Sequence, residues 1–284
     1  MTPARFITGL SEIAGRYDAV LCDAWGVIHD GVRLFPGVAD ALIEFRRARG
    51  PVIILTNAPR PNSIIPGQLD RLGLPREAYD AVVTSGDATR TAIAAMHPMA
   101  AFKLGPTKDE GLYEGLDIAF APLDAAGFII CTGLFDDERE TPDDYRDLLA
   151  RAAARRLPMI CANPDIVVRW GGRLIYCAGA LAKVYEDLGA TVIYGGKPHA
   201  PIYALAMATI ERIAGRAVPA NRTLAVGDGV PTDIAGANRQ RIDALFIAGE
   251  GGVHEGNADA RAIAAALAGA GVHAAYAAKA LVWK

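Results

Sequence analysis

The chain is predicted to adopt an α/β fold: a doubly wound, Rossmann-like parallel sheet with a second α/β unit inserted into it. Short apolar segments alternate with longer segments whose apolar residues recur at helical spacing. The short segments have no polar face, which is typical of parallel strands covered by helices on both sides. The alternation changes character near His97-Pro98 and resumes near residue 191, so the sequence predicts a core interrupted by an insertion.

The first part of the core, residues 1–97, contains three predicted strand–helix pairs. Strands are expected at 19–22, 52–55 and 81–83, and helices at 36–49, 63–72 and 87–96. The first helix follows Pro36-Gly37 and carries Val38, Leu42 and Phe45 on one face, and Gly50-Pro51 ends it. Between the first strand and this helix, the turn His29-Asp30-Gly31 predicts a small hairpin over residues 26–35.

The predicted insertion, residues 98–190, has the pattern of a separate α/β unit. Its strands are expected at 101–104, 127–131, 158–162 and 174–176, with a helix over 142–156 that Thr141 caps. The core then continues through residues 191–284. Strands are expected there at 191–194, 223–226 and 243–247, and helices at 201–214, from Thr232-Asp233 onward, and at 258–267.

Composition excludes several classes of function. The 284 residues are 52% hydrophobic, enough for a large core, and the net charge of -3 gives no electrostatic reason to bind nucleic acid or an anionic membrane. The four cysteines lack metal-ligand spacing, which favours reduced thiols in a cytoplasmic protein. No apolar segment is long enough to cross a membrane, and residues 1–17 lack the pattern of a signal peptide.

Polar side chains follow the predicted core strands at their carboxyl ends. These are Asp23, Thr56, Asn57, Lys197, Asp228 and Asp233. Each has an ordinary structural explanation, as a turn or helix cap or a solvated residue. Together they are expected to meet in one crevice, because open parallel sheets bind ligands at this edge. Carboxylates are the ligands that Mg²⁺ prefers, and hydroxyl, amide and ammonium groups hold phosphoryl oxygens.

These motifs resemble those of the haloacid dehalogenase superfamily of phosphohydrolases, and within it the class IIA, NagD-like group. The four motifs are Asp23, Leu55-Thr56-Asn57, Gly195-Gly196-Lys197-Pro198, and Gly227-Asp228 through Thr232-Asp233. The inserted block resembles the class IIA cap, including Asn163-Pro164-Asp165 and Gly179-Ala180. The resemblance extends over nearly the whole chain.

The resemblance implies hydrolysis of a small phosphate ester through an aspartyl-phosphate on Asp23. It implies that Mg²⁺ is held by Asp23, Asp228, the backbone carbonyl of Trp25 and, through a water molecule, Asp233. It also implies that Thr56, Asn57 and Lys197 bind the phosphoryl group. The cap, with Asn163 and Asp165, is expected to close over the substrate. A small phosphorylated metabolite is the implied partner, and a homodimer is open by analogy with other class IIA caps.

Residue 25 departs from the family pattern. Phosphatases of this family carry a second aspartate there, which protonates the leaving group and then activates water. An indole has no proton that titrates near neutral pH, so Trp25 can do neither. If the protein is a phosphatase, its acid comes from elsewhere, with His29, Asp30 and Asp165 as candidates, or its substrates are aryl or acyl phosphates with good leaving groups.

Two other interpretations stay open. Dehalogenases of the superfamily also carry an aromatic residue at this position, but they need no metal, and the retained acidic motif counts against that chemistry. Alternatively, the protein binds a phosphorylated ligand with little turnover, as a sensor. Lys103, Arg169, Trp170 and Arg173 in the insertion are candidates to reach a ligand or to be solvated surface residues.

Overall fold

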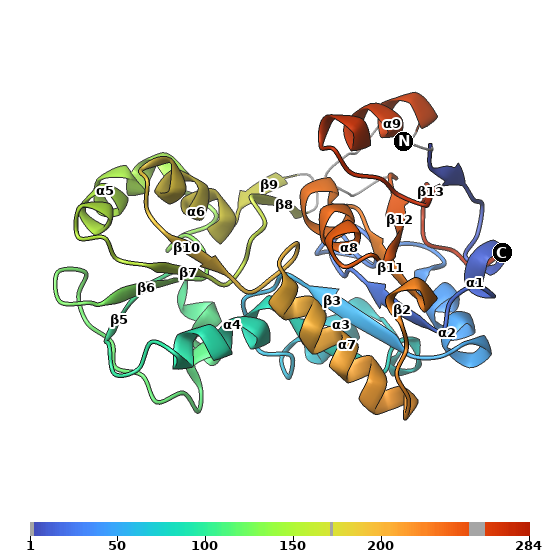
Figure 1. The fold of residues 1–284 in the computed structure, drawn as a ribbon, viewed down its shortest axis with the longest axis horizontal. Helices are drawn as coiled ribbons and strands as arrows, with labels where there is room; N and C mark the ends of the chain where they lie inside the picture. The colour runs from blue at the N-terminus through green and yellow to red at the C-terminus, as the bar shows by residue number, and fades with distance from the viewer. Residues whose placement is uncertain (1–2, 171–172, 250–258) are drawn as a thin grey trace.

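Two parallel sheets, set side by side, organise the chain (Figure 1). The computed structural model describes residues 3–170, 173–249 and 259–284. The larger sheet has the order β1-β13-β12-β11-β2-β3-β4, and every pair in it is parallel. Its strands are β1 (Arg5–Phe6), β2 (Ala19–Cys22), β3 (Val52–Thr56), β4 (Ala81–Thr84), β11 (Thr223–Gly227), β12 (Asp243–Ile247) and β13 (Tyr276–Ala278).

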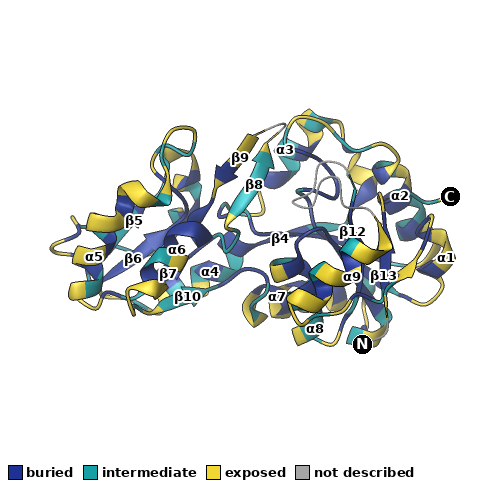
Figure 2. Cartoon of the chain, turned by 90° about the horizontal axis from the view of Figure 1, so that it is seen from above, coloured by how far each residue is buried: buried dark blue, intermediate teal, exposed yellow. Residues whose placement is uncertain are grey.

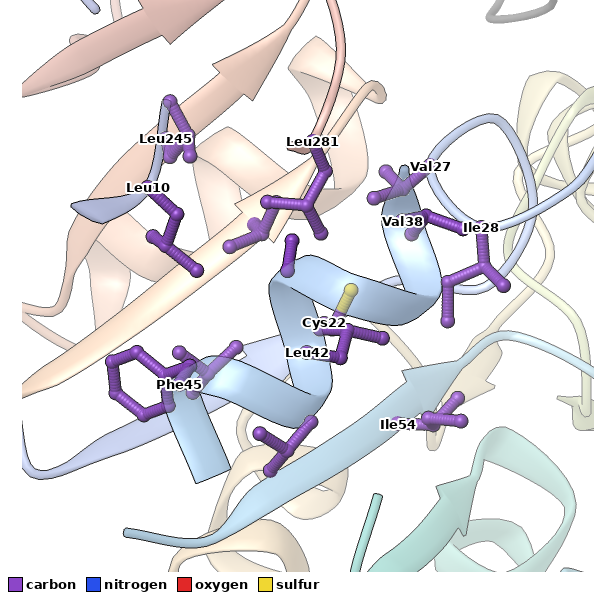
Figure 3. Packing of buried hydrophobic residues seen from close by; sticks show 14 of the residues in the cluster. Leu10, Cys22, Val27, Ile28, Val38, Leu42, Phe45, Ile54, Leu245 and Leu281 are labelled. Carbon is purple, nitrogen blue, oxygen red and sulfur yellow. The ribbon is translucent and has the colours of Figure 1, made fainter. Parts of the chain in front are cut away.

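Both faces of the larger sheet are covered by helices, as the strands without a polar face predict. One face carries α1 (Ser11–Ala14), α2 (Val38–Ala48) and α3 (Ile65–Leu72), and the other carries α7 (Ala200–Ala214), α8 (Ala235–Arg239) and α9 (Ala260–Gly269). Successive residues of β2 alternate between the two apolar clusters. Figure 3 shows the α2 side, where Leu42 and Phe45 of α2 belong to the same apolar cluster as Cys22 of β2 and Ile54 of β3.

The site-bearing strands lie where the sheet changes direction. From β2 the chain proceeds outward through β3 to β4, whereas β11, β12 and β13 extend from the other side of β2. The carboxyl ends of β2 and β11 are therefore neighbours at a topological switch point. Ligands of open α/β sheets bind in the crevice beyond such a point.

The smaller unit is built on the sheet β10-β7-β6-β5, which is also parallel. Its strands are β5 (Ala101–Leu104), β6 (Phe128–Cys131), β7 (Met159–Cys161) and β10 (Val192–Tyr194), and α5 (Arg146–Ala154) and α6 (Ala178–Asp187) pack on it. A separate antiparallel hairpin, β8 (Val167–Trp170) with β9 (Arg173–Tyr176), projects from this unit. Figure 2 shows that its outer surface is partly exposed.

α4 (Ser85–Ala94) follows β4 and connects the two units. It packs against α7 of the larger unit and against β7 of the smaller one. The predicted helix, from Asp87 to Met96, lies two residues too far along the chain, since α4 begins at Ser85 and ends at Ala94. Thr84 is the N-cap, and its hydroxyl accepts a hydrogen bond from the Asp87 N–H.

One predicted strand lies in the other sheet. Residues 191–194 were expected to begin the second part of the core, but β10 pairs with β7 in the smaller sheet. An isolated three-residue apolar strand fits either sheet locally, and only the pairing decides between them. Lys197 therefore reaches the site from the segment that returns to the larger unit, and does not follow a core strand directly.

The remaining differences are elements that were missed or placed differently. The strands β1, β8 and β13 and the helices α1 and α6 were not predicted. The helix expected over 142–156 begins with a 3-10 turn, Pro142–Tyr145, before α5. Thr232 and Asp233 lie in a π-helical turn, Val230–Ile234, that leads into α8. None of the helices in the described residues is long and apolar enough to cross a membrane.

Candidate active site

Asp23 lies directly beyond β2, with its carboxylate fixed from two sides. Its Oδ1 accepts a hydrogen bond of 2.8 Å from the backbone N–H of Ala24. The same oxygen lies 2.7 Å from Nζ of Lys197. Only 8% of the residue is exposed. Among the described residues, no hydrogen bond to Oδ2 is found, so one oxygen is anchored and the other is left for a ligand.

Three carboxylates meet beside this point. Asp23, Asp228 and Asp233 each offer an oxygen, and these oxygens lie within 4.8 Å of one another. Nζ of Lys197 is 2.7 Å from Asp233 Oδ1 as well as from Asp23. Burial, followed by the charge of Asp233, raises the pKa of Asp23. Burial opposes the ammonium form of Lys197, but the surrounding carboxylates outweigh it and hold the Lys197 pKa above its usual value.

Gly26 makes room for this cluster. Its φ of 78° lies in the left-handed region. A Cβ at this position would come within 2.2 Å of Oδ2 of Asp228. Only glycine allows both the turn and the close approach of the Asp228 carboxylate. The tight turn after β2 therefore serves to bring the β2 and β11 carboxylates together.

Asn57, after β3, organises the segment that carries Lys197. Its Oδ1 accepts a hydrogen bond of 2.8 Å from the backbone N–H of Lys197, and its Nδ2 donates to the Lys197 carbonyl at 3.2 Å. The same Nδ2 donates to Oδ1 of Asp165 at 2.9 Å. The amide thus joins the larger unit to Asp165 of the smaller unit, and it fixes the backbone from which the Lys197 ammonium extends.

A cavity of about 410 Å³ opens above Asp23 between the two units. The larger unit contributes Thr56 and Asn57, and the smaller unit contributes Asn163 and Asp165. The volume lies within the range of small-molecule sites. The residues predicted for the site are therefore brought together: Asp23, Trp25, Thr56, Asn57, Lys197, Asn163, Asp165, Asp228 and Asp233 lie in or beside this cavity.

Trp25 forms one wall of the cavity and contacts the β8–β9 hairpin. Its indole Nε1 donates a hydrogen bond of 2.6 Å to the carbonyl of Arg169. Its ring makes edge-to-face contacts with His29 and Trp170, with centroids 5.1 and 6.4 Å apart. Gly31 also needs to be glycine, because a Cβ there would lie 2.6 Å from the indole. Trp25 therefore joins the two units instead of supplying a proton.

The structure separates the three candidate acids. Asp30 accepts hydrogen bonds from the N–H groups of Val32 and Arg33 and pairs with the Arg33 side chain. Although burial raises it, these bonds leave the pKa of Asp30 below its usual value, and the residue does not line the cavity. Asp30 stabilises the turn of the predicted hairpin, in which His29 and Leu34 form an isolated antiparallel bridge.

His29 and Asp165 both line the cavity but differ in protonation. Burial lowers the pKa of His29 to about 4, so its ring is neutral near pH 7, and its Nδ1 accepts a hydrogen bond from the Gly31 N–H. Burial raises the pKa of Asp165 above its usual value, although Lys197 and Asn57 oppose the shift. A carboxyl with a raised pKa is the better proton donor near neutrality.

The candidates from the insertion have different surroundings. Trp170 lines the cavity, and Arg169 meets Trp25 through its backbone. Lys103 pairs with Glu110, and Arg173 donates to the carbonyl of Glu138; neither lines the cavity. Sequence reasoning missed several polar residues of the cavity, among them Arg60 and Asp109. Their positions shortly after β3 and β5 were the available signal, since both strands end at the same crevice.

Two family models match the chain. A model for haloacid dehalogenase-like hydrolases matches residues 20–118, and a second model for HAD-like hydrolases matches residues 194–273. A crystal structure of a haloacid dehalogenase-like hydrolase from Brucella suis is 43% identical, with a TM-score of 0.89, over 98% of this chain and 100% of that one. The chain belongs to the haloacid dehalogenase-like hydrolase family. The resemblance drawn from the motifs is confirmed.

More distant solved structures share the fold. A possible sugar phosphatase from Cytophaga hutchinsonii is 20% identical, with a TM-score of 0.82, and the match covers 99% of both chains. A glycerol phosphate phosphatase from Mycobacterium tuberculosis in complex with magnesium is 21% identical, with a TM-score of 0.63, over 85% of this chain and 70% of that one. No curated protein matches this chain in sequence.

Proposed function

We propose that this hydrolase is a Mg²⁺-dependent phosphatase of small phosphate monoesters that acts through an aspartyl-phosphate on Asp23. The observation that carries the proposal is the arrangement at the switch point. One carboxylate is anchored through a single oxygen, two others lie within 4.8 Å, and a buried ammonium lies 2.7 Å from the first. The names of the two distant relatives, a possible sugar phosphatase and a glycerol phosphate phosphatase, support the same class of substrate.

The donor set fits Mg²⁺. Three carboxylates offer hard oxygen ligands at one point, and the backbone around Trp25 lies in the same turn. Asp23, Asp228 and Asp233, with the carbonyl of Trp25, would hold the ion, as one distant relative was crystallised with magnesium. When bound, the ion would offset the negative charge that gathers where a phosphoryl group meets Asp23.

The chain's own residues then define the reaction. A carboxylate oxygen of Asp23 attacks phosphorus, a new P–O bond forms, and the bond to the leaving oxygen breaks. The Thr56 hydroxyl and the Lys197 ammonium stabilise the phosphoryl oxygens. The Asn57 amide, whose N–H groups bind Asp165 and the Lys197 carbonyl, positions both residues around the phosphoryl group. Water next attacks the phosphorus of the aspartyl-phosphate, which releases inorganic phosphate and restores the Asp23 carboxylate.

Asp165 is proposed as the group that replaces the missing second aspartate. Its carboxyl gives a proton to the departing alkoxide, and the resulting carboxylate accepts a proton from the attacking water. The Asn57 amide orients it at 2.9 Å. The smaller unit acts as the cap, because it brings Asp165 and the β8–β9 hairpin over Asp23 and excludes bulk water.

The test is phosphate release from p-nitrophenyl phosphate and a panel of alkyl phosphates, with and without Mg²⁺, beside Asp23→Asn. We expect activity that needs the ion and is abolished by Asp23→Asn. Activity on the aryl ester alone would assign no proton donor to the site and would contradict the role of Asp165. A folded protein that binds phosphorylated compounds but releases phosphate from none of them would favour the sensor interpretation, to which Trp25 in the acid position also points.

A further inference from the structure

One side of the cavity is apolar and is formed largely by the β8–β9 hairpin. Val168 and Ile175 are partners across the hairpin, and Trp170 lies on the same face as Val168, because alternate residues of a strand share a face. All three line the cavity, as does Tyr176 at the end of β9. Trp25 continues this surface from the larger unit, with its ring centroid 6.4 Å from that of Trp170. We call these five side chains the apolar wall.

The apolar wall presents aromatic surface that the protein itself does not cover. Trp170 is 46% exposed and Tyr176 is 40% exposed, although tryptophan is highly buried on average. The ring of His29, whose lowered pKa leaves it uncharged near pH 7, also lines the cavity and contacts Trp25 edge to face. Exposed apolar surface inside a concave site is typical of ligand binding.

The charged groups of the cavity, by contrast, mostly pair with one another. Arg60 pairs with Asp109, and Lys108 pairs with Asp137. Arg71 of α3 forms no ion pair among the described residues, but it is exposed, so its guanidinium is solvated without a ligand. The charged part of the lining therefore does not require a polar leaving group. The apolar wall is the surface that a leaving group is left to cover.

The position of Asp23 determines what covers the wall. Asp23 and Trp170 line the same cavity of about 410 Å³. In the proposed reaction the phosphoryl group lies at Asp23, so the group esterified to it extends into that cavity. The ring of Trp25 stands at 69° to His29 and at 73° to Trp170, so neither pair forms a slot with parallel faces for a planar ring. A flexible aliphatic chain follows such an uneven surface.

We propose that the apolar wall selects phosphate monoesters of aliphatic alcohols, whose hydrocarbon chain packs on Trp170, Ile175 and Tyr176. This proposal rests on the proposed phosphatase function, because it places the phosphoryl group at Asp23. It narrows the small phosphate esters to those with an apolar, flexible leaving group. It also agrees with the role proposed for Asp165, because an aliphatic alkoxide needs a proton as it departs.

The experiment measures how activity depends on the length of the chain. Steady-state kcat/KM is measured with Mg²⁺ for n-alkyl phosphates from ethyl to octyl, below the concentrations at which they form micelles. Glycerol 1-phosphate is compared with propyl phosphate, which has the same number of carbons. Benzyl phosphate is compared with heptyl phosphate, since both have the same number of carbons and both leave as alkoxides.

We expect kcat/KM to rise by about two- to fourfold for each added methylene until the chain reaches the opening of the cavity, the upper value being that of a fully buried methylene. Propyl phosphate should exceed glycerol 1-phosphate by at least about tenfold, because hydroxyl groups lose water at the wall without gaining partners. Heptyl phosphate should be used at least as well as benzyl phosphate.

Two variants and a matched control test whether the wall causes the preference. Trp170→Ser and Tyr176→Ser should lower kcat/KM for octyl phosphate by at least about fivefold, and for ethyl phosphate by less than about twofold. Leu174→Ser is the control, because Leu174 belongs to the same hairpin and is 57% exposed but does not line the cavity. It should leave the whole chain-length series unchanged.

Calorimetric titration of Asp23→Asn with the same phosphates separates this proposal from the phosphatase proposal, because that variant is expected not to turn over. Affinity should increase with chain length, and the heat capacity change of binding should become more negative with each methylene. Such binding without turnover in the wild type would refute the phosphatase function and support the apolar wall as a binding surface.

Three results would overturn the selection of aliphatic chains. One is a kcat/KM and an affinity that do not depend on chain length. Another is a preference for glycerol 1-phosphate over propyl phosphate, or for benzyl phosphate over heptyl phosphate. The third is a pair of variants, Trp170→Ser and Tyr176→Ser, that lower activity on ethyl and octyl phosphate equally, which would make the hairpin a structural element only.

Discussion

Asp165→Asn tests the proposed division of labour between the two units. The substitution keeps the shape of the side chain and an oxygen that can accept from Asn57 Nδ2, which now lies 2.9 Å from Asp165 Oδ1. It removes only the transferable proton. Any large kinetic effect therefore reports proton donation and not a lost contact.

The size of the effect should depend on the leaving group. An alkoxide needs a proton as it departs, so kcat on alkyl phosphates should fall by roughly 10²–10⁴-fold. A nitrophenolate is stable without one, so kcat on p-nitrophenyl phosphate should fall less than about fivefold if formation of the aspartyl-phosphate limits its rate. A plot of log kcat/KM against leaving-group pKa should become steeper in the variant.

The controls for Asp165→Asn are the two rejected acids. Asp30→Asn and His29→Gln should leave the leaving-group dependence of the wild type unchanged, because Asp30 is held in the hairpin turn and His29 is neutral near pH 7. The reasoning fails if Asp165→Asn lowers alkyl and aryl activity to the same extent, which would mean that Asp165 only positions the substrate or the Asn57 amide. It also fails if Asp30→Asn produces the steeper plot.

Three further predictions follow from the turn after β2. Trp25→Asp restores the usual acid position and should raise kcat on alkyl phosphates. Loss of the hydrogen bond from the indole to the Arg169 carbonyl should lower the free energy of unfolding by about 0.5–1.5 kcal/mol. An unchanged or lower kcat in the folded variant would contradict the kinetic prediction. Gly26→Ala should raise the Mg²⁺ concentration for half-maximal activity at least about tenfold, because the alanine Cβ displaces Asp228. An unaltered Mg²⁺ titration would show that the turn can accommodate a Cβ without moving Asp228. For His29, with its pKa lowered to about 4 in the fold, the unfolded chain binds more protons between pH 6.5 and 4. The free energy of unfolding should therefore fall by on the order of 3 kcal/mol as the pH drops through that interval, and chemical denaturation of His29→Gln should lack this component.

The agreement between sequence and structure is best where the information is local. A four-residue apolar strand followed by Asp23, and another followed by Gly227-Asp228, are sufficient to predict buried parallel strands with carboxylates at one edge. The stripe of Val38, Leu42 and Phe45 likewise predicts the face of α2 that packs on the sheet. These features depend on side-chain periodicity, which the chain carries regardless of its neighbours.

What only the tertiary structure decided involves partners distant in the chain. The strand at 192–194 joins the smaller sheet, where it pairs with β7. The sequence of a three-residue strand does not indicate which sheet it enters. In the sequence, Trp25 is only a departure from the family's nucleophile motif. In the structure, its indole donates a hydrogen bond to the carbonyl of Arg169, 144 residues away.

The protonation of the three candidate acids was equally hidden from the sequence. Asp30 and Asp165 are the same residue type, yet one is tied into a turn and the other is buried beside Asn57. Arg60 and Asp109 become a pair only when the two units meet. The sequence by itself thus determined most of the strands, their polar ends and the family, because these follow from local periodicity and motif order. The fold decided which distant groups share a dielectric environment and a hydrogen bond, because burial and distance arise only from packing.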